Sequence, residues 1–379
     1  MRKFIIAAVL ALCLGIGLFA VKYRTQNKPV RIGFVAALSG RLSQMGVSAR
    51  NGVELAIDDM NRGGGVLGRT IVLVAKDNKG DLKANFEAVR ELLDNGVNII
   101  VAPFTSKMAE PAMLALQGKN ALIVTPTVSA DALKDLDDNF LRITTTSSDQ
   151  ARQITAEVLK QGCRTAAVVY DSANRAYTEP LYLVFKKLFE TAGKTIVYTE
   201  ISDDTKNSDF FHIAKAIEKS GAEALLLITS GIDAAALCQQ IQKTGSKIKI
   251  FGSSWVKTND LLEHGGKSVE GILLVSAYES REKTAEYLEF EKQYLFRFKK
   301  KPNFVSSLSY EAAQVIFSGI QNSRSTDPKG VKMAILKTKH FKGLEETFTI
   351  NEFGDAVRKF SAFVVREGKF ERVDRMDKK

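Results

Sequence analysis

Residues 30–40 read VRIGFVAALSG, an apolar run with β-branched residues that ends in small polar residues. In the stretch that follows, apolar residues recur at the i, i+3, i+4, i+7 spacing of an amphipathic helix: Val53, Ala56, Ile57 and Met60. A strand that is apolar on both faces and leads into such a helix is typical of a parallel sheet covered by helices. This stretch therefore predicts an α/β fold.

The same pattern of strand and helix repeats along the chain. Predicted strands lie at 31–36, 70–76, 98–102, 121–125, 165–170, 195–199, 224–228, 247–252 and 271–277. Predicted helices run roughly over 81–95, 107–118, 149–161, 177–192, 208–220, 232–244, 283–300, 306–322 and 328–337. Repeated strand–helix–strand units imply right-handed crossovers and a doubly wound sheet. The pattern restarts after the polar stretch 144–149, which indicates a hinge into a second lobe.

Four of the predicted strands end in short polar tips. The tips are Ala37–Gly40, Pro103–Ser106, Thr125–Ser129 and Gly252–Trp255. In parallel α/β sheets, ligands bind beyond the carboxyl ends of the strands, where helix N-termini present free N–H groups. Ser106 and Ser129 each precede a predicted helix, so we expect both to be N-caps that hold an anion. The chain is therefore predicted to bind a small polar ligand, with a carboxylate at these two serines.

The formal net charge of +11 is not concentrated on one surface of the predicted fold. Residues 1–28 hold five Lys/Arg and no acid, which leaves 49 basic against 43 acidic residues in the rest of the chain. The densest basic cluster there, Lys299–Lys301, ends a predicted helix, where the helix dipole favours cations. One Trp and scattered aromatic residues offer no stacking platform for bases. We therefore expect no nucleic-acid binding.

The segment 1–28 has the pattern of an export signal. A basic start, Met1–Lys3, is followed by 18 apolar or glycine residues from Phe4 to Val21 and then by Lys22, Tyr23 and Arg24. A cleavage site prefers small residues at positions −3 and −1, and Leu18–Ala20 offers only the second of them. An apolar run of 18 residues is just long enough to span a bilayer. A cleaved signal peptide and a retained signal-anchor are therefore both alternatives. In either case we expect a periplasmic or otherwise extracytoplasmic protein, held at the inner membrane if the anchor is retained.

No catalytic constellation is evident. The three histidines, His212, His264 and His340, show no metal-ligand spacing. The sequence GGGVLG at 63–68 matches G-x-G-x-x-G, but it follows a predicted helix and precedes a strand, which reverses the order of a dinucleotide fingerprint. We therefore predict no catalytic residue, no metal and no cofactor, and we do not expect an enzyme.

Several motifs resemble the leucine/isoleucine/valine-binding protein family. The motifs are Ile32–Gly40, Asn51–Asn61, Gly64–Arg69, Asp77, Glu110–Ala112, Tyr170–Asp171 with Tyr177, and Val269–Gly271. They occur in the right order over about residues 30–370. These relatives are type I periplasmic binding proteins, the substrate-binding components of branched-chain amino acid ABC transporters.

The resemblance implies two Rossmann-like, doubly wound lobes joined by a three-stranded hinge that closes over the ligand. The predicted lobes are 29–148 plus 277–353, and 149–276 plus 354–373. The resemblance also implies that Ser106 and Ser129 hold a ligand α-carboxylate and that the Val128 carbonyl receives its ammonium. Tyr177 is expected to close over the ligand from the second lobe.

Three positions depart from the family pattern. Met45 stands where an aromatic residue usually covers the side-chain pocket, and Thr229–Gly231 replaces an expected Tyr. The tip Gly252–Trp255 lacks the Glu that neutralises the ammonium. Because a buried ammonium without a carboxylate is costly, either Asp233 or Asp171 supplies the charge, or the ligand has no α-amino group. Ser254 and Trp255 are then expected to contact the ligand, with Trp255 stacked on an apolar body.

The sequence therefore predicts an extracytoplasmic solute-binding protein. Its ligand is expected to be an amino acid, branched-chain or similar, or a related small carboxylate, and its partner an ABC permease of the inner membrane. A ligand sensor of the same fold, periplasmic or tethered to the membrane, is the alternative.

Overall fold

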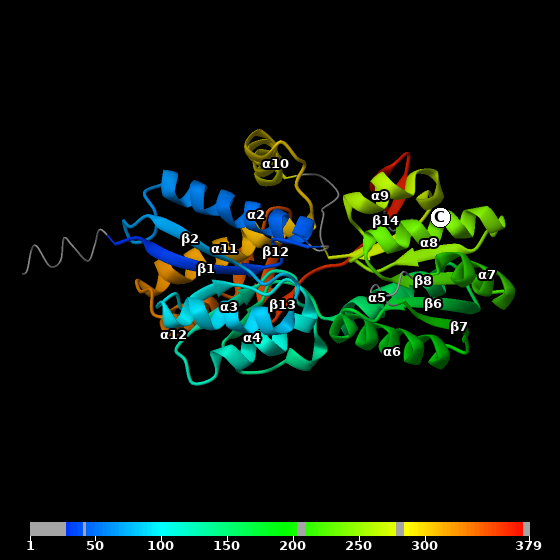
Figure 1. Ribbon diagram of the computed structural model, residues 1–379, viewed down its shortest axis with the longest axis horizontal. Helices are drawn as coiled ribbons and strands as arrows, with labels where there is room; N and C mark the ends of the chain where they lie inside the picture. Colours follow the sequence, from blue (N-terminus) through cyan, green and yellow to red (C-terminus); the bar gives the residue numbers. More distant parts are fainter. Residues whose placement is uncertain (1–27, 41–42, 203–208, 278–283, 374–379) are drawn as a thin grey trace, which may run out of the picture.

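The computed structural model describes residues 28–40, 43–202, 209–277 and 284–373, which form two lobes side by side (Figure 1). The predicted N-terminal signal segment lies outside these residues, apart from Lys28. Within the ranges that are described, no helix is both long enough and apolar enough to cross a membrane.

The first lobe is built on a parallel sheet with the strand order β2-β1-β3-β4-β5. Its strands are β1 (Val30–Ala36), β2 (Ile71–Asp77), β3 (Ile99–Val101), β4 (Leu122–Thr125) and β5 (Phe140–Arg142). Its helical segments are α2 (Ser43–Arg62), α3 (Leu82–Asp94), η1 (Ser106–Met108), α4 (Ala109–Leu116), η2 (Asp131–Leu133), α10 (Ala285–Phe298), α11 (Phe304–Ser323) and α12 (Pro328–Thr338). A small antiparallel sheet of β11 (His340–Lys342), β12 (Thr347–Ile350) and β13 (Ala356–Val357) completes this lobe.

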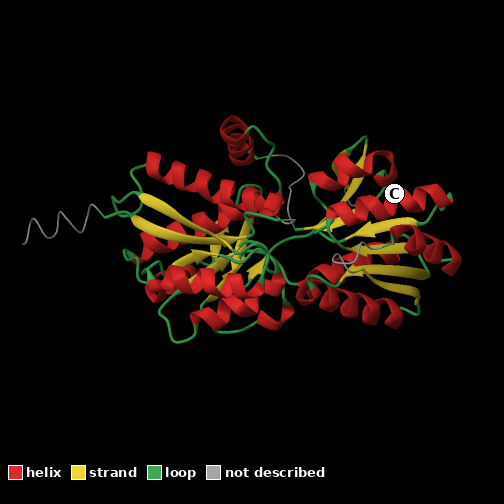
Figure 2. Cartoon of the chain, viewed as in Figure 1, coloured by secondary structure: helices red, strands yellow, loops and turns green. Residues whose placement is uncertain are grey.

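The second lobe has a seven-stranded sheet with the order β15-β14-β10-β9-β8-β6-β7. Its parallel strands are β6 (Thr165–Asp171), β7 (Thr195–Ser202), β8 (Ala224–Ile228), β9 (Lys249–Gly252) and β10 (Leu273–Ser276). The antiparallel strands β14 (Ser361–Arg366) and β15 (Lys369–Val373) extend one edge. Helical segments cover both faces (Figure 2): α5 (Ser147–Lys160), α6 (Arg175–Thr191), α7 (Phe210–Ser220), α8 (Gly231–Thr244), α9 (Asn259–Gly265) and η4 (Gly266–Val269).

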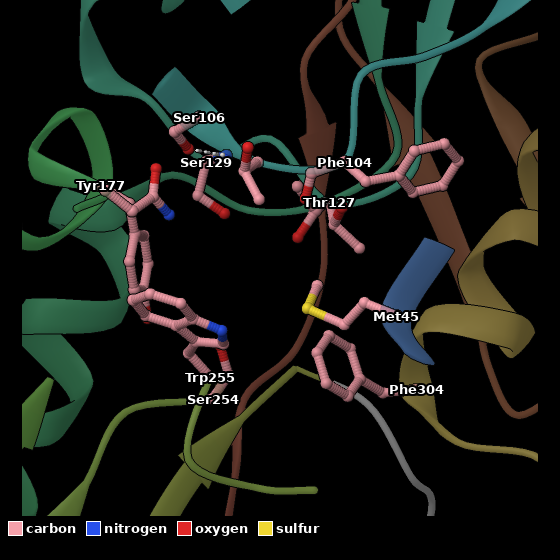
Figure 3. A pocket seen from close by; sticks show the side chains of 12 residues that line it. Met45, Phe104, Ser106, Thr127, Ser129, Tyr177, Ser254, Trp255 and Phe304 are labelled. Atoms are coloured by element: carbon pink, nitrogen blue, oxygen red, sulfur yellow. Dashed lines mark hydrogen bonds between the residues drawn. The ribbon is translucent and has the colours of Figure 1, made fainter. Parts of the chain in front are cut away.

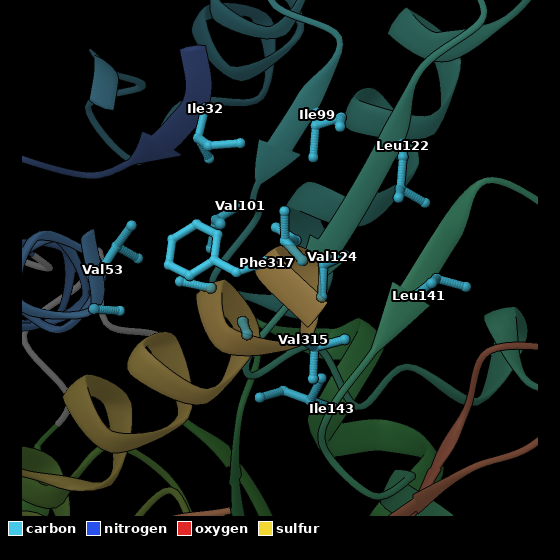
Figure 4. Close-up of a cluster of buried hydrophobic side chains, with 14 of the residues drawn as sticks. Ile32, Val53, Ile99, Val101, Leu122, Val124, Leu141, Ile143, Val315 and Phe317 are labelled. Atoms are coloured by element: carbon cyan, nitrogen blue, oxygen red, sulfur yellow. The ribbon is translucent and has the colours of Figure 1, made fainter. Parts of the chain in front are cut away.

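Alternate residues of the central strands enter different cores, as a doubly covered parallel sheet requires. In β3, Ile99 and Val101 pack with α2 and α11, whereas Ile100 packs with α3 and α4. Figure 4 shows the first of these clusters, where Val53 and Phe317 meet the sheet. The predicted α/β fold with two doubly wound lobes is thereby confirmed.

Three connections join the lobes. They follow β5, β10 and β13, and part of the second lies outside the described residues. Two hydrogen bonds link the segments next to the first and third connections. The buried Arg142 Nε donates to Asp355 Oδ1. The Arg358 Nε donates to the Ile143 carbonyl at 2.7 Å. These contacts fasten the first and third connections to one another.

One predicted lobe boundary is wrong by a few residues. The prediction assigned 354–373 to the second lobe, but β13 pairs with β12, and Ala356 packs in the core of the first lobe beside Ile350. The chain crosses only after Val357. The position of this crossing could not be predicted from the sequence, because a two-residue strand such as β13 has no periodicity to detect.

Candidate ligand-binding site

A pocket lies between the lobes, at the carboxyl ends of strands from both sheets. It contains about 440 Å³ of space between side chains, with the open solvent at its mouth included. The first lobe contributes Met45, Phe104, Thr105, Ser106, Thr127, Ser129, Thr144 and Phe304. The second lobe contributes Asn174, Tyr177, Ser254 and Trp255. The structure thus brings together six of the eight predicted site residues.

Ser106 and Ser129 lie side by side at the tips that follow β3 and β4 (Figure 3). The Ser129 amide donates to the Ser106 Oγ at 3.2 Å, which leaves the Ser106 hydroxyl hydrogen to point elsewhere. Both serines are nearly buried, at 5% and 7% exposure. They therefore present two hydroxyl groups on one wall of the pocket.

Neither serine is a helix N-cap, which corrects the prediction. Ser106 is the first residue of η1, whose N-cap is Thr105, and α4 begins only at Ala109. After Ser129 the chain forms only the three-residue turn η2, and the N-cap of that turn is Ala130. A turn this short adds little dipole, so what the two serines present to the pocket is their hydroxyl groups.

The opposite polar wall is held together by Gln150, which the sequence did not single out. The Tyr177 hydroxyl donates to Gln150 Oε1 at 2.6 Å, and Gln150 Nε2 donates to the Ser254 Oγ at 2.6 Å. The Ser254 amide also donates to Gln150 Oε1, at 3.2 Å. One buried amide from α5 thus positions the tyrosine of α6 and the serine after β9. Burial raises the pKa of Tyr177 to about 12, so its phenol stays neutral at physiological pH.

Apolar side chains form the rest of the pocket. Met45 and Phe304 face Tyr177 and Trp255 across it (Figure 3). The edge of one ring of the Tyr177–Trp255 pair meets the face of the other, with centroids 5.9 Å apart and planes at 80°. This geometry fixes both rings, and it presents a rigid apolar surface to a ligand.

Two predicted site residues do not line the pocket. Val128 is fully buried in the core beside α3 and α4. Asp233 lies in the first turn of α8, where its carboxylate accepts from the Ser230 hydroxyl at 2.7 Å. Asp171, the other candidate partner for an ammonium, accepts from the Ala173 amide and does not line the pocket. Both carboxylates accept hydrogen bonds from groups within three residues of them in the chain.

The pocket is therefore electrically neutral in the part of the chain that the structure describes. None of its twelve lining residues is Asp, Glu, Lys, Arg or His, and the described residues contain no cluster of side chains suited to a metal ion. Phe304, Asn174 and Thr144 line the site although sequence patterns gave no signal for them. Phe104, Thr105 and Thr127 fall within the quoted strand tips but carried no predicted role.

A sequence profile described as periplasmic binding protein matches residues 29–369 of this chain. The chain belongs to the periplasmic binding protein family. Members of this family act outside the cytoplasm and bind solutes, and this chain is a solute-binding protein. Among curated relatives, a Leu/Ile/Val-binding protein homologue of Brucella melitensis is 26% identical over 330 residues, which span 86% of this chain and 88% of the relative.

Solved structures of similar proteins share the fold. A branched-chain amino acid transporter substrate-binding protein of Streptococcus pneumoniae, in complex with isoleucine, superposes with a TM-score of 0.84 and 21% identity, over 91% of this chain and 99% of that one. An ABC transporter solute-binding protein from R. palustris, in complex with benzoate, gives 0.80 and 18%, over 91% and 96%. The resemblance to the leucine/isoleucine/valine-binding family, found first in the motifs, is confirmed.

Proposed function

We propose that this periplasmic binding protein captures a small carboxylate that has no ammonium group and delivers it to an ABC permease. The observation that carries the proposal is a pocket with clustered hydroxyl donors and no ionised side chain of either sign among its lining residues. Hydroxyl groups can hold a carboxylate, whereas an ammonium would find no carboxylate partner there.

The two serines supply the grip on the carboxylate. The Ser106 Oγ already accepts a hydrogen bond from the Ser129 amide, so its own hydrogen can be donated to a ligand oxygen. Across the pocket, the Ser254 Oγ accepts from Gln150, which likewise directs its hydrogen away from the amide. Hydrogen bonds to an ionised acceptor are about twice as strong as neutral ones. Hydroxyl donors from both lobes therefore line the pocket.

The rest of the pocket suits a neutral, apolar ligand body. Met45, Phe104, Phe304 and Trp255 line it, and Phe104 is held in place by Phe34, with ring centroids 5.1 Å apart. Transfer of an unpaired ammonium into such surroundings costs several kcal/mol, on the order of 3 or more. The same body without the amino group avoids this cost.

Matched ligand pairs test the proposal. We expect 4-methylpentanoate and benzoate to bind in isothermal titration calorimetry and to raise the melting temperature, because both carry a carboxylate on an apolar body. Leucine has the carbon skeleton of 4-methylpentanoate plus an ammonium, and we expect it to bind at least about tenfold more weakly. Leucine binding tighter than 4-methylpentanoate would overturn the ligand class, and absence of binding by all three would overturn the carboxylate site.

Export and delivery are further parts of this proposal. The apolar segment Phe4–Val21 supports export, and it leaves cleavage and anchoring as two alternatives. The intact mass of the protein purified from a Gram-negative host separates them, since cleavage near Ala20 removes about 20 residues. Full-length mass in the membrane fraction would establish the anchor, and a shortened soluble form would establish the signal peptide.

A further inference from the structure

Asn174 connects the two lobes at the ligand pocket. It lies in the second lobe, directly before α6, and is one of the residues that line the pocket. Its side-chain Oδ1 accepts a hydrogen bond from the backbone amide of Lys107 in the first lobe, at 3.0 Å. Lys107 follows Ser106, the residue assigned above to the ligand carboxylate. One hydrogen bond therefore spans the cleft one residue away from the proposed grip.

This use of Asn174 is unusual among the helix starts of the chain. Asn is a favoured N-cap because its side-chain oxygen accepts from an amide of the first turn. That bond is made at the starts of other helices by Asp81, Thr146, Asp209, Ser230, Thr284, Asn303 and Asp327. The Asn174 side chain makes no such bond with α6, although it occupies the same position. Its oxygen is turned to the opposite lobe instead.

The nitrogen of the same amide remains for the ligand. Oδ1 is used by Lys107, and among the described residues Nδ2 has no hydrogen-bond acceptor, while the residue is only 7% exposed and faces the pocket. An amide nitrogen donates two hydrogens and cannot accept. The polar partner that suits it is an anionic or carbonyl oxygen within the pocket.

We propose that Asn174 is a ligand-dependent latch: it joins the lobes through Oδ1 and donates to the ligand carboxylate through Nδ2. When the lobes separate, the Lys107 amide moves away, and Oδ1 can turn back to cap the free first-turn amide of α6 at Ala176. The side chain thus has one partner in each state. The ligand favours the latched state because only there do Ser106 and Asn174 reach the same carboxylate. The ligand half of this inference rests on the proposed function.

A second hydrogen bond between the lobes lies close to a connection and has no such role. The Ser148 hydroxyl donates to Asp131 Oδ2 at 2.6 Å, but Ser148 lies in the first turn of α5, directly after the first connection. A contact so close to a hinge is kept when the lobes rotate. The bond between Lys107 and Asn174 lies away from the connections and breaks on opening.

Variants of Asn174 test the latch, with benzoate as the probe. Asn174→Ala removes both hydrogen bonds, so we expect benzoate affinity to fall about tenfold or more in calorimetry. Asn174→Asp keeps an oxygen for Lys107 but replaces the donor by a negative charge facing the carboxylate, so we expect a loss at least as large. Asp209→Ala, which removes the N-cap of α7, is the matched control and should leave affinity unchanged.

Small-angle X-ray scattering gives a readout that does not require a ligand. Ligand-free Asn174→Ala should have a larger radius of gyration than the wild type, while the melting temperature of the ligand-free protein stays close to the wild-type value. Unchanged benzoate affinity in Asn174→Ala, or an unchanged radius of gyration, would overturn the latch. If benzoate fails to bind the wild-type protein, the proposed ligand class falls, and the scattering comparison still decides whether Asn174 joins the lobes.

Discussion

Replacing Ser106 by alanine tests the center of the proposed binding site. The Ser106 side chain is nearly buried, accepts from the Ser129 amide at 3.2 Å, and has its hydroxyl hydrogen left for the ligand. Ser106→Ala therefore removes a hydrogen bond to a charged group, which contributes about 1.5–3 kcal/mol. It also deprives the Ser129 amide of its acceptor. We expect the dissociation constant for 4-methylpentanoate to rise by about 10- to 150-fold.

Titration calorimetry at constant pH and salt measures this change. Ser39→Ala is the matched control, because Ser39 also follows a strand of the first sheet but is exposed and donates to Asp77 Oδ2 at 2.6 Å outside the pocket. We expect this control to bind as the wild type does. If Ser106→Ala binds 4-methylpentanoate with unchanged affinity, the serines do not hold the carboxylate, and the reasoning from strand tips to grip is refuted.

Four further predictions concern the second lobe and the hinge. Gln150→Leu removes the amide that positions Tyr177 and Ser254. Calorimetry should therefore show that benzoate affinity falls by at least about fivefold. The raised pKa of Tyr177 means that its phenol is neutral in the folded protein up to about pH 12, so benzoate affinity should be constant from about pH 6 to 9. The raised pKa also makes the free energy of unfolding depend on pH. Its contribution is fully present below the ordinary tyrosine pKa of about 10, and urea denaturation should show the free energy of unfolding decreasing as pH rises from about 10 to 12. Asp355→Ala leaves the buried guanidinium of Arg142 without its carboxylate, and urea denaturation should show a loss of about 3–5 kcal/mol.

Each of these expectations has a result that contradicts it. Wild-type affinity in Gln150→Leu would mean that the tyrosine and serine hold their places without the amide. A benzoate affinity that changes steeply between pH 6 and 9 would require a titrating group at the pocket. The control for the hinge is Arg164→Ala, which breaks the exposed ion pair with Glu223 and should change the free energy of unfolding little. If Asp355→Ala lowers the free energy of unfolding no more than this control does, the buried pair does not stabilise the hinge as expected.

The pocket combines residues that match the family pattern with positions that differ from it. The serines at the strand tips and the tyrosine of α6 stand in the pocket as the resemblance implies. The tip after β9 brings Ser254 and Trp255 there, without an acid. Under the proposed function, the chain keeps the serines expected to hold a carboxylate and has hydroxyl and apolar groups where the family pattern expects the partner of an ammonium.

The sequence by itself determined most of the elements and the edge of the sheets at which the pocket lies. Local patterns sufficed because a strand such as Val30–Ala36 is apolar on both faces. The polar tips after β3, β4 and β9 mark the edge of the sheets where the pocket lies. Ser106 and Ser129 could be chosen on this basis. The same local view failed for their role as N-caps, because whether a helix follows Ser129 depends on packing that no short window contains.

Only the tertiary structure decided which residues from distant segments meet at the pocket. Phe304 lines it together with Met45, and Gln150 positions Ser254 at its wall; in each of these pairs the two residues are separated in sequence by more than a hundred residues. The direction of Asp233 likewise follows from its own helix start. Asn174 is the clearest case: it occupies the N-cap position of α6, but the neighbouring lobe gives its oxygen a different partner, because that hydrogen bond is available only after both lobes have folded.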